Sequence, residues 1–162
     1  MSDPPVAFVD RPSEWEPPQP AEVRASWGSL AARMRVYTAR MGEYHNHDAL
    51  NVTRGARDEL GVLFAPSWRL LRPYLDARRD GVLTESHWHD YTRGFLDEMR
   101  ASWKREREQW LRVLKRRELT FLCFCTDVTH CHRLLLATQV FPSFGATYEG
   151  ERPPTVKVAG RW

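Results

Sequence analysis

The sequence predicts an α/β protein with a small, mainly parallel, Rossmann-like sheet and helices on both faces. Three β-rich runs, at residues 33–38, 49–53 and 119–125, are separated by segments with helical periodicity. Their connections are short, and strands that alternate with helices are typical of parallel sheets. In such sheets ligands bind beyond the carboxyl ends of the strands, so a site is expected at that edge.

The composition indicates one compact domain. A chain of 162 residues with 42% hydrophobic content can form a full core. No apolar stretch approaches the ~20 residues of a membrane span, so no membrane partner is expected. The first twenty residues contain six prolines among charged residues, which disfavours regular structure. We therefore divide the chain into a Pro-rich N-terminal arm, residues 1–20, and a single α/β domain, residues 21–162.

The cysteine content predicts free thiols. Cys123, Cys125 and Cys131 are clustered and odd in number, so they do not form a disulfide framework. The N-terminus has no positively charged and then apolar signal segment. A reducing, cytoplasmic location is expected. The sequence does not indicate the oligomeric state.

The first half of the domain predicts two short strands and two helical segments. Residues 21–32 are compatible with a helix and lead into the first strand, residues 33–38. Residues 49–53 form the second, short strand. A helix is expected over residues 66–77 because proline is tolerated in a first helical turn. Pro73 should kink or shorten that helix.

A long helical segment is predicted from Thr84, a candidate N-cap, to about residue 116. His87 occupies the place where a capping box usually has Glu. A break near Ala101 or Ser102 would give two helices of ordinary length. The segment has an apolar stripe at helical spacing, which predicts core packing. The stripe consists of Trp88, Phe95, Met99, Trp103, Trp110 and Leu114.

The same segment concentrates the basic residues of the chain. The net charge of +3 is too small to require nucleic acid. The face opposite the apolar stripe nevertheless carries Lys104, Arg105, Arg112, Lys115 and Arg116. This face predicts either an ordinary solvated surface or nucleic-acid binding. Arg107 falls within the apolar sector and therefore needs a partner, either an internal carboxylate or an anionic substrate.

Residues 119–133 hold the candidate functional site. They predict a strand, a short loop and the start of a helix that continues through the apolar residues 134–136. Cys123 and Cys125 should share one face of the strand, because side chains alternate. Cys131 would lie at the helix N-terminus beside Arg133, where the dipole and the guanidinium lower a thiol pKa. Cys131 is therefore the best thiolate candidate.

The leading functional hypothesis is an enzyme that acts on a small anionic or nucleotide-like molecule. Cys131 or Cys125 would be the nucleophile, His132 the proton carrier and Arg133 the anion clamp. Arg40 and Arg54 end or follow the first two strands, and we expect them to converge with Arg133. No glycine-rich phosphate loop and no Cys-x5-Arg loop is present, so side chains would hold a bound nucleotide.

Two further interpretations of the cysteines stay open. Cys123, Cys125 and Cys131, with His130 or alternatively His132, supply enough ligands for a structural zinc site, although the sequence requires no cofactor. The spacing of Cys123 and Cys125 differs from that of a zinc knuckle, which makes the zinc site the less favoured interpretation. Alternatively, the cysteines only pack as small buried residues.

Little regular structure is predicted for the C-terminal segment. Pro142 and Gly145 should end the regular structure that follows the Cys-His-Arg triplet, and residues 155–158 could add a terminal strand. Between them, Tyr148, Glu149 and Glu151 could supply acid–base groups near the site, although a surface loop is the commoner fate of such residues.

The strand, the Cys-x-Cys pair, the short loop, the Cys-His-Arg triplet and the Leu-rich helix resemble the C-terminal signature of the domain of unknown function 488 family. Other segments of one branch of that family follow in the same order, namely Val36–Arg40, Leu50–Arg54, Phe64–Trp68 and Gly145–Glu151. The resemblance covers about residues 34–152. It implies an α/β fold and a phage-associated context, but no settled activity. Asn51 stands where that branch is expected to have an acidic residue.

Overall fold

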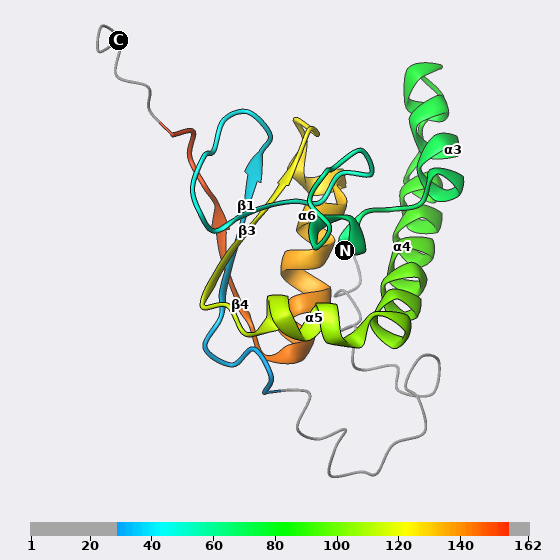
Figure 1. The fold of residues 1–162 in the computed structure, drawn as a ribbon. Coiled ribbons are helices and arrows are strands. Elements are labelled where there is room, and N and C mark those ends of the chain that lie inside the picture. The colour runs from blue at the N-terminus through cyan, green and yellow to red at the C-terminus, as the bar shows by residue number, and fades with distance from the viewer. Residues whose placement is uncertain (1–28, 156–162) are drawn as a thin grey trace, which may run out of the picture.

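The computed structural model describes residues 29–155 of the chain (Figure 1). The expected Pro-rich arm, residues 21–28 of the expected helix over residues 21–32, and residues 156–158 of the expected terminal strand lie outside the described residues, and residues 29–32 form a turn. Within residues 29–155, no helix is long and apolar enough to cross a membrane.

One parallel sheet forms the centre of the fold. Its strands are β1 (Arg35–Arg40), β2 (Ala49–Asn51), β3 (Glu118–Cys123) and β4 (Thr147–Glu151). They are arranged in the order β2-β3-β1-β4, and every neighbouring pair is parallel. The prediction of a small, parallel, Rossmann-like α/β sheet is confirmed. The carboxyl ends of β1 and β3 lie side by side, since Arg40 is in register with Cys123.

The fourth strand corrects the expectation that regular structure ends at Gly145. Gly145 has a φ of 100°, in the left-handed region, and it reverses the chain after the last helical turn. The chain then pairs along the free edge of β1, with a register shift between Val36 and Tyr37. This strand is largely exposed and polar, so its side chains carry little strand signal. Backbone pairing with β1 defines it.

The helical elements follow the predicted order with shifted boundaries. In chain order they are η1 (Gly61–Phe64), α3 (Trp68–Arg79), α4 (Glu85–Arg105), α5 (Arg107–Leu114), η2 (Val128–His130), α6 (His132–Leu135), the π-helical η3 (Leu136–Val140) and η4 (Phe141–Phe144). The capping box expected at Thr84 is present, with His87 in the position of the usual Glu. Pro73 lies inside α3 but does not shorten it, because the helix continues to Arg79.

The break in the long helical segment lies at Glu106, later than expected. Ser102 lies within α4, and its hydroxyl donates to Leu63 O and accepts from Trp110 Nε1, each at 3.0 Å. The turn at Glu106 brings the rings of Trp103 and Trp110 into an edge-to-face contact with centroids 5.7 Å apart. Both tryptophans are fully buried, which confirms the prediction that they belong to the core.

The described helices cover one face of the sheet, a correction to the expected cover on both faces (Figure 1). The main core joins Val36, Leu119 and Phe121 of the strands to residues of α4, α5 and the α6–η4 segment. The smaller cluster consists of Ala39, Tyr44 and Leu122, with Met41 and Ala49 beside it, and holds no helical residue. Arg152 closes that face instead, with its guanidinium carbon 3.4 Å from the centre of the Tyr37 ring.

Candidate functional site

The end of β3 and the start of α6 bring the three cysteines together. Cys123 ends β3, Cys125 follows two residues later, and Cys131 is the N-cap of α6. Their Sγ atoms all lie within 4.8 Å of one another, and those of Cys123 and Cys125 are 3.8 Å apart. The expected gathering of these two segments at the sheet edge is therefore present. All three thiols are free, as predicted.

His132 is buried behind the sulfur atoms. Its Nε2 lies 2.7 Å from the carbonyl oxygen of Val52 and must donate to it. In a neutral ring this leaves Nδ1 as an acceptor, 3.8 Å from Cys123 Sγ and 4.0 Å from Cys131 Sγ. Burial lowers the pKa of His132 to about 4. The ring is thus neutral at neutral pH and orients the thiols.

Arg133 connects the cysteine cluster to strand β4. Its side chain is 1% exposed and donates to Cys125 O at 2.7 Å and to Glu151 Oε1 at 3.1 Å. Glu151 also accepts a short hydrogen bond from Thr38 Oγ1. The same guanidinium lies 3.6 Å from Cys131 Sγ. Because Arg133 already has these partners, its position suits holding the cluster together better than clamping a free anion.

The arrangement of the sulfur atoms favours the thiolate form at Cys125 over the other two cysteines. Hydrogen bonds from the thiols of Cys123 and Cys131, together with the positive charge of Arg133, lower the pKa of Cys125. The pKa of Cys131 is raised by its contacts with the other two sulfurs and by burial. This corrects the expectation of a lowered pKa at Cys131. The dipole of the four-residue helix α6 is outweighed by direct contacts between thiols.

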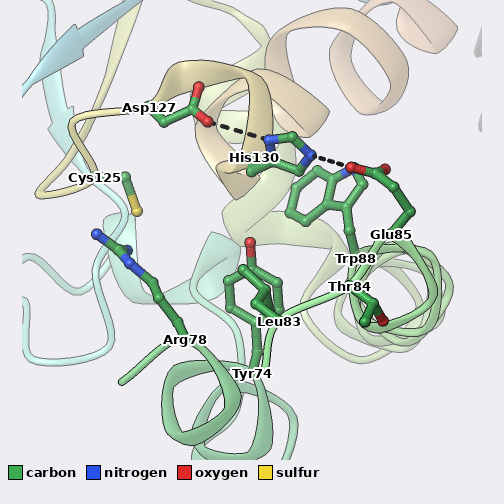
Figure 2. Close-up of a pocket in the computed structure, with 9 residues that line it drawn as sticks. All are labelled: Tyr74, Arg78, Leu83, Thr84, Glu85, Trp88, Cys125, Asp127 and His130. Atoms are coloured by element: carbon green, nitrogen blue, oxygen red, sulfur yellow. Dashed lines mark hydrogen bonds and ion pairs between the residues drawn. The ribbon is translucent and has the colours of Figure 1, made fainter. Parts of the chain in front are cut away.

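Two pockets open beside the cluster. The outer pocket has a volume of about 400 Å³ and lies between α3, the start of α4 and the loop after β3 (Figure 2). It is lined by Tyr74, Arg78, Leu83, Thr84, Glu85, Trp88, Cys125, Asp127 and His130. The apolar pocket has a volume of about 430 Å³ and includes Trp68, Leu71, Leu75, Tyr91 and Phe124. Both pockets share Tyr74, Arg78, Cys125 and His130. Of the three cysteines, only Cys125 lines both.

His130 belongs to the outer pocket and lies outside the sulfur cluster. Its Nδ1 lies 3.2 Å from Asp127 Oδ2 and its Nε2 lies 3.3 Å from Glu85 Oε1 (Figure 2). Its ring also meets the edge of Trp88, with centroids 5.0 Å apart. Both nitrogens therefore face carboxylates. His130 is thus not placed to share a metal ion with the cysteines, contrary to the expectation for it. His132 is the histidine that faces the sulfur atoms.

Of Arg40, Arg54 and Arg107, only Arg54 lies at the expected site. Arg54 lines the apolar pocket, but its guanidinium donates to the carbonyl oxygens of Ala65 and Pro66 at 2.6 and 2.7 Å. Arg40 is exposed and pairs with Glu43 at 3.3 Å. Arg107 lies over the ring of Trp103, with its guanidinium carbon 4.9 Å from the ring centre. Neither Arg40 nor Arg107 lines the two pockets.

The structure adds site residues that the sequence did not single out. Tyr74 and Arg78 are four residues apart on α3 and therefore share one face, which is the only signal that they carry. In Figure 2 the Arg78 guanidinium extends toward Cys125, and the Tyr74 hydroxyl points into the space between them and His130. Asn51, which the family resemblance already singles out, lines the apolar pocket, and its Oδ1 accepts from Thr53 N and Oγ1 at 3.0 and 2.6 Å.

The chemistry of the donor set also permits a metal ion. Three sulfur atoms within 4.8 Å of one another are close enough to bind one ion together. His132 Nδ1 is directed toward two of them, and the hydrogen bond from its Nε2 to Val52 would keep it oriented as a ligand.

Comparisons with known proteins identify the family. Residues 29–141 match the family model described as "Active DUF488-N3 subclade". Neither the search of curated proteins nor the search of solved structures gave a match. The matched range covers more than half of the chain and includes the whole cysteine cluster, His132 and Arg133. The chain therefore belongs to the domain of unknown function 488 (DUF488) family.

Proposed function

We propose that this protein is an enzyme that acts on a small anionic or nucleotide-like substrate, with Cys125 as its nucleophile. The position of Cys125 at the junction of the outer and apolar pockets is the observation that carries this proposal. Cys123 and Cys131 are buried and flank it. A nucleophile needs both access to the substrate and a stabilised charged form, and Cys125 combines the two.

The neighbouring residues would divide the remaining tasks. Arg133 holds the backbone at Cys125, and His132 orients the two buried thiols. His130, held by Asp127 and Glu85, is the proton carrier at the pocket surface. The thiolate gives its electron pair to an electrophilic carbon of the substrate, and the leaving group takes a proton from His130. Water then attacks the same carbon and gives a proton back to His130, and the C–S bond breaks to restore the thiolate. The word "active" in the description of the family model agrees with a catalytic role.

Turnover by matched cysteine variants tests this proposal. A panel of nucleotides is incubated with the wild type, C125S and C123S, and products are measured by mass spectrometry. We expect C125S to lose turnover and any covalent adduct, while C123S keeps part of the activity because its side chain only flanks the nucleophile. Unchanged turnover by C125S would remove Cys125 from the mechanism.

A zinc centre is the second candidate, favoured by the distances between the sulfur atoms. Two thiolates of a tetrahedral zinc site lie about 3.8 Å apart, since each Zn–S bond is about 2.3 Å. Cys123 Sγ and Cys125 Sγ are separated by 3.8 Å. Cys123, Cys125, Cys131 and His132 would then be the ligands. Elemental analysis of the purified, reduced protein decides between the two. Stoichiometric zinc that protects all three thiols until a chelator is added would replace thiol catalysis by metal chemistry.

The nucleic-acid alternative depends on the basic residues of α4 and α5. Lys104, Arg105 and Arg112 are exposed, and Arg105 lies 3.7 Å from Glu106. The phage-associated context of the family resemblance agrees with such a role. This alternative predicts DNA or RNA binding that weakens steeply with salt. Binding that survives the simultaneous loss of all three cations would exclude this face.

A further inference from the structure

We propose that Arg78 binds the anionic group of the substrate while the apolar pocket takes an attached planar aromatic ring. The ligand class is an aromatic anion in which the ring and a phosphate or carboxylate are close together, as in a nucleoside monophosphate. This inference rests on the proposed function for the choice of site. It concerns binding alone and does not require Cys125 to react.

Arg78 differs from Arg79, the next residue along the helix, in having no carboxylate partner among the described residues. Arg79 pairs with Asp76 at 3.2 Å and with Asp80 at 3.3 Å. Within residues 29–155, the Arg78 guanidinium makes neither an ion pair nor a side-chain hydrogen bond, although it lines both pockets. Its donors are thus available to a ligand, and a guanidinium matches the oxygens of a phosphate or carboxylate.

The other charged groups of the outer pocket leave the space beside the Arg78 guanidinium open to an anion. Asp127 and Glu85 face the two nitrogens of His130, which lies on the opposite wall from Arg78 (Figure 2). An anion is therefore attracted toward Arg78 and repelled from the carboxylates. Held there, the anionic group would place its neighbouring atoms next to Cys125, which lies beside Arg78 in the same view.

The apolar pocket provides the complementary surface for a ring. Trp68 is 50% exposed and Phe124 is 68% exposed, and both line this pocket together with the exposed Leu75. Deeper in the pocket, the rings of Tyr74 and Tyr91 lie 4.9 Å apart. Exposed apolar side chains gathered around one opening are expected of a ligand site, and aromatic walls favour stacking with a planar ring.

Binding of nucleoside monophosphates, compared with their uncharged nucleosides, tests both halves of the inference. Affinities of the four ribonucleoside monophosphates and the four nucleosides are measured by calorimetry on the full chain. We expect at least one monophosphate to bind ~10-fold or more tightly than its nucleoside, as one charge-assisted contact provides. R78Q should remove this difference, R78K should keep part of it, and R79Q is the matched control that should leave it unchanged. W68A should weaken the monophosphate and its nucleoside by the same factor.

Each result is decisive for the inference. Equal affinity for monophosphate and nucleoside in the wild type, or equal weakening by R78Q and R79Q, would overturn the role of Arg78. No binding of any monophosphate at millimolar concentration would overturn the ligand class. The affinity difference between monophosphate and nucleoside is measured without turnover, so its failure is distinguishable from that of the proposed function, which the turnover of C125S tests. Equal melting temperatures of R78Q and R79Q verify that both variants fold.

Discussion

The buried guanidinium of Arg133 donates a 2.7 Å hydrogen bond to the carbonyl oxygen of Cys125. This contact joins the Cys-His-Arg segment to the Cys-x-Cys segment across the loop. It places the Cys125 sulfur at the junction of the pockets, while the ion pair to Glu151 anchors the arginine on β4. The stability of the site should therefore depend on Arg133.

Replacing Arg133 by Met should lower the free energy of unfolding by roughly 2–4 kcal/mol. The change leaves Cys125 O without its donor and Glu151 without its partner. Because Glu151 is partly exposed to solvent, the loss of stability should be smaller than for a fully buried ion pair. Urea unfolding of the wild type and R133M measures this change in the free energy of unfolding. E151Q is the control and should cost less, because its amide oxygen can still accept from the arginine. A neutral effect of R133M would contradict this account.

Cys125 should be the fastest thiol to be alkylated in mildly acidic solution. Its pKa is lowered below the ordinary value of 9.0, so a larger fraction of Cys125 than of an ordinary thiol is ionised at about pH 6. Iodoacetamide labelling followed by peptide mapping should find the adduct on Cys125, and C125S should abolish the fast phase. The advantage over a free thiol shrinks as the pH rises toward 9. Preferential labelling of Cys131 would refute the assignment.

Asp48 should make the fold sensitive to acid. Burial alone would raise the pKa of Asp48, but hydrogen bonds from Thr120 and Tyr44 and the charge of Arg152 outweigh it, so the pKa lies below 3.8. The stabilisation is therefore complete above the unfolded-state pKa and is lost as the pH falls through the folded-state value.

The variant D48N checks this assignment. Thermal unfolding of both proteins is followed from about pH 6 to about pH 2. D48N should be less stable by about 1–3 kcal/mol at neutral pH, and the gap should close in acid as the wild-type carboxylate is protonated. A gap that does not depend on pH would exclude Asp48 as the titrating group.

Removing the hydroxyl of Ser102 should destabilise the core by about 1–3 kcal/mol, because the buried Trp110 Nε1–H loses its acceptor. Chemical denaturation of S102A measures this loss. The double variant S102A/W110F supplies the control, since phenylalanine has no donor to leave unsatisfied. The second substitution should therefore cost less in the S102A background than in the wild type, whereas strictly additive losses would rule out the coupling.

The sequence by itself determined the elements with strong local signals. The apolar runs predicted β1 and β3, and Thr84 with His87 marked the start of α4. Such features depend on neighbouring residues along the chain, so periodicity and capping chemistry reveal them. The closeness of the cysteine segments also followed from sequence, because only a short loop separates strand from helix.

Only the tertiary structure decided which residues of the cluster face the pockets. Cys125 lines both pockets, whereas the buried Cys131 lines only the apolar one, His132 rather than His130 faces the sulfur atoms, and Arg133 is paired with Glu151. Arg78 enters the site from α3, and β4 exists because β1 offers a free edge. Exposure, hydrogen-bond partners and thiol pKa values depend on contacts between segments far apart in the chain, which no local pattern encodes.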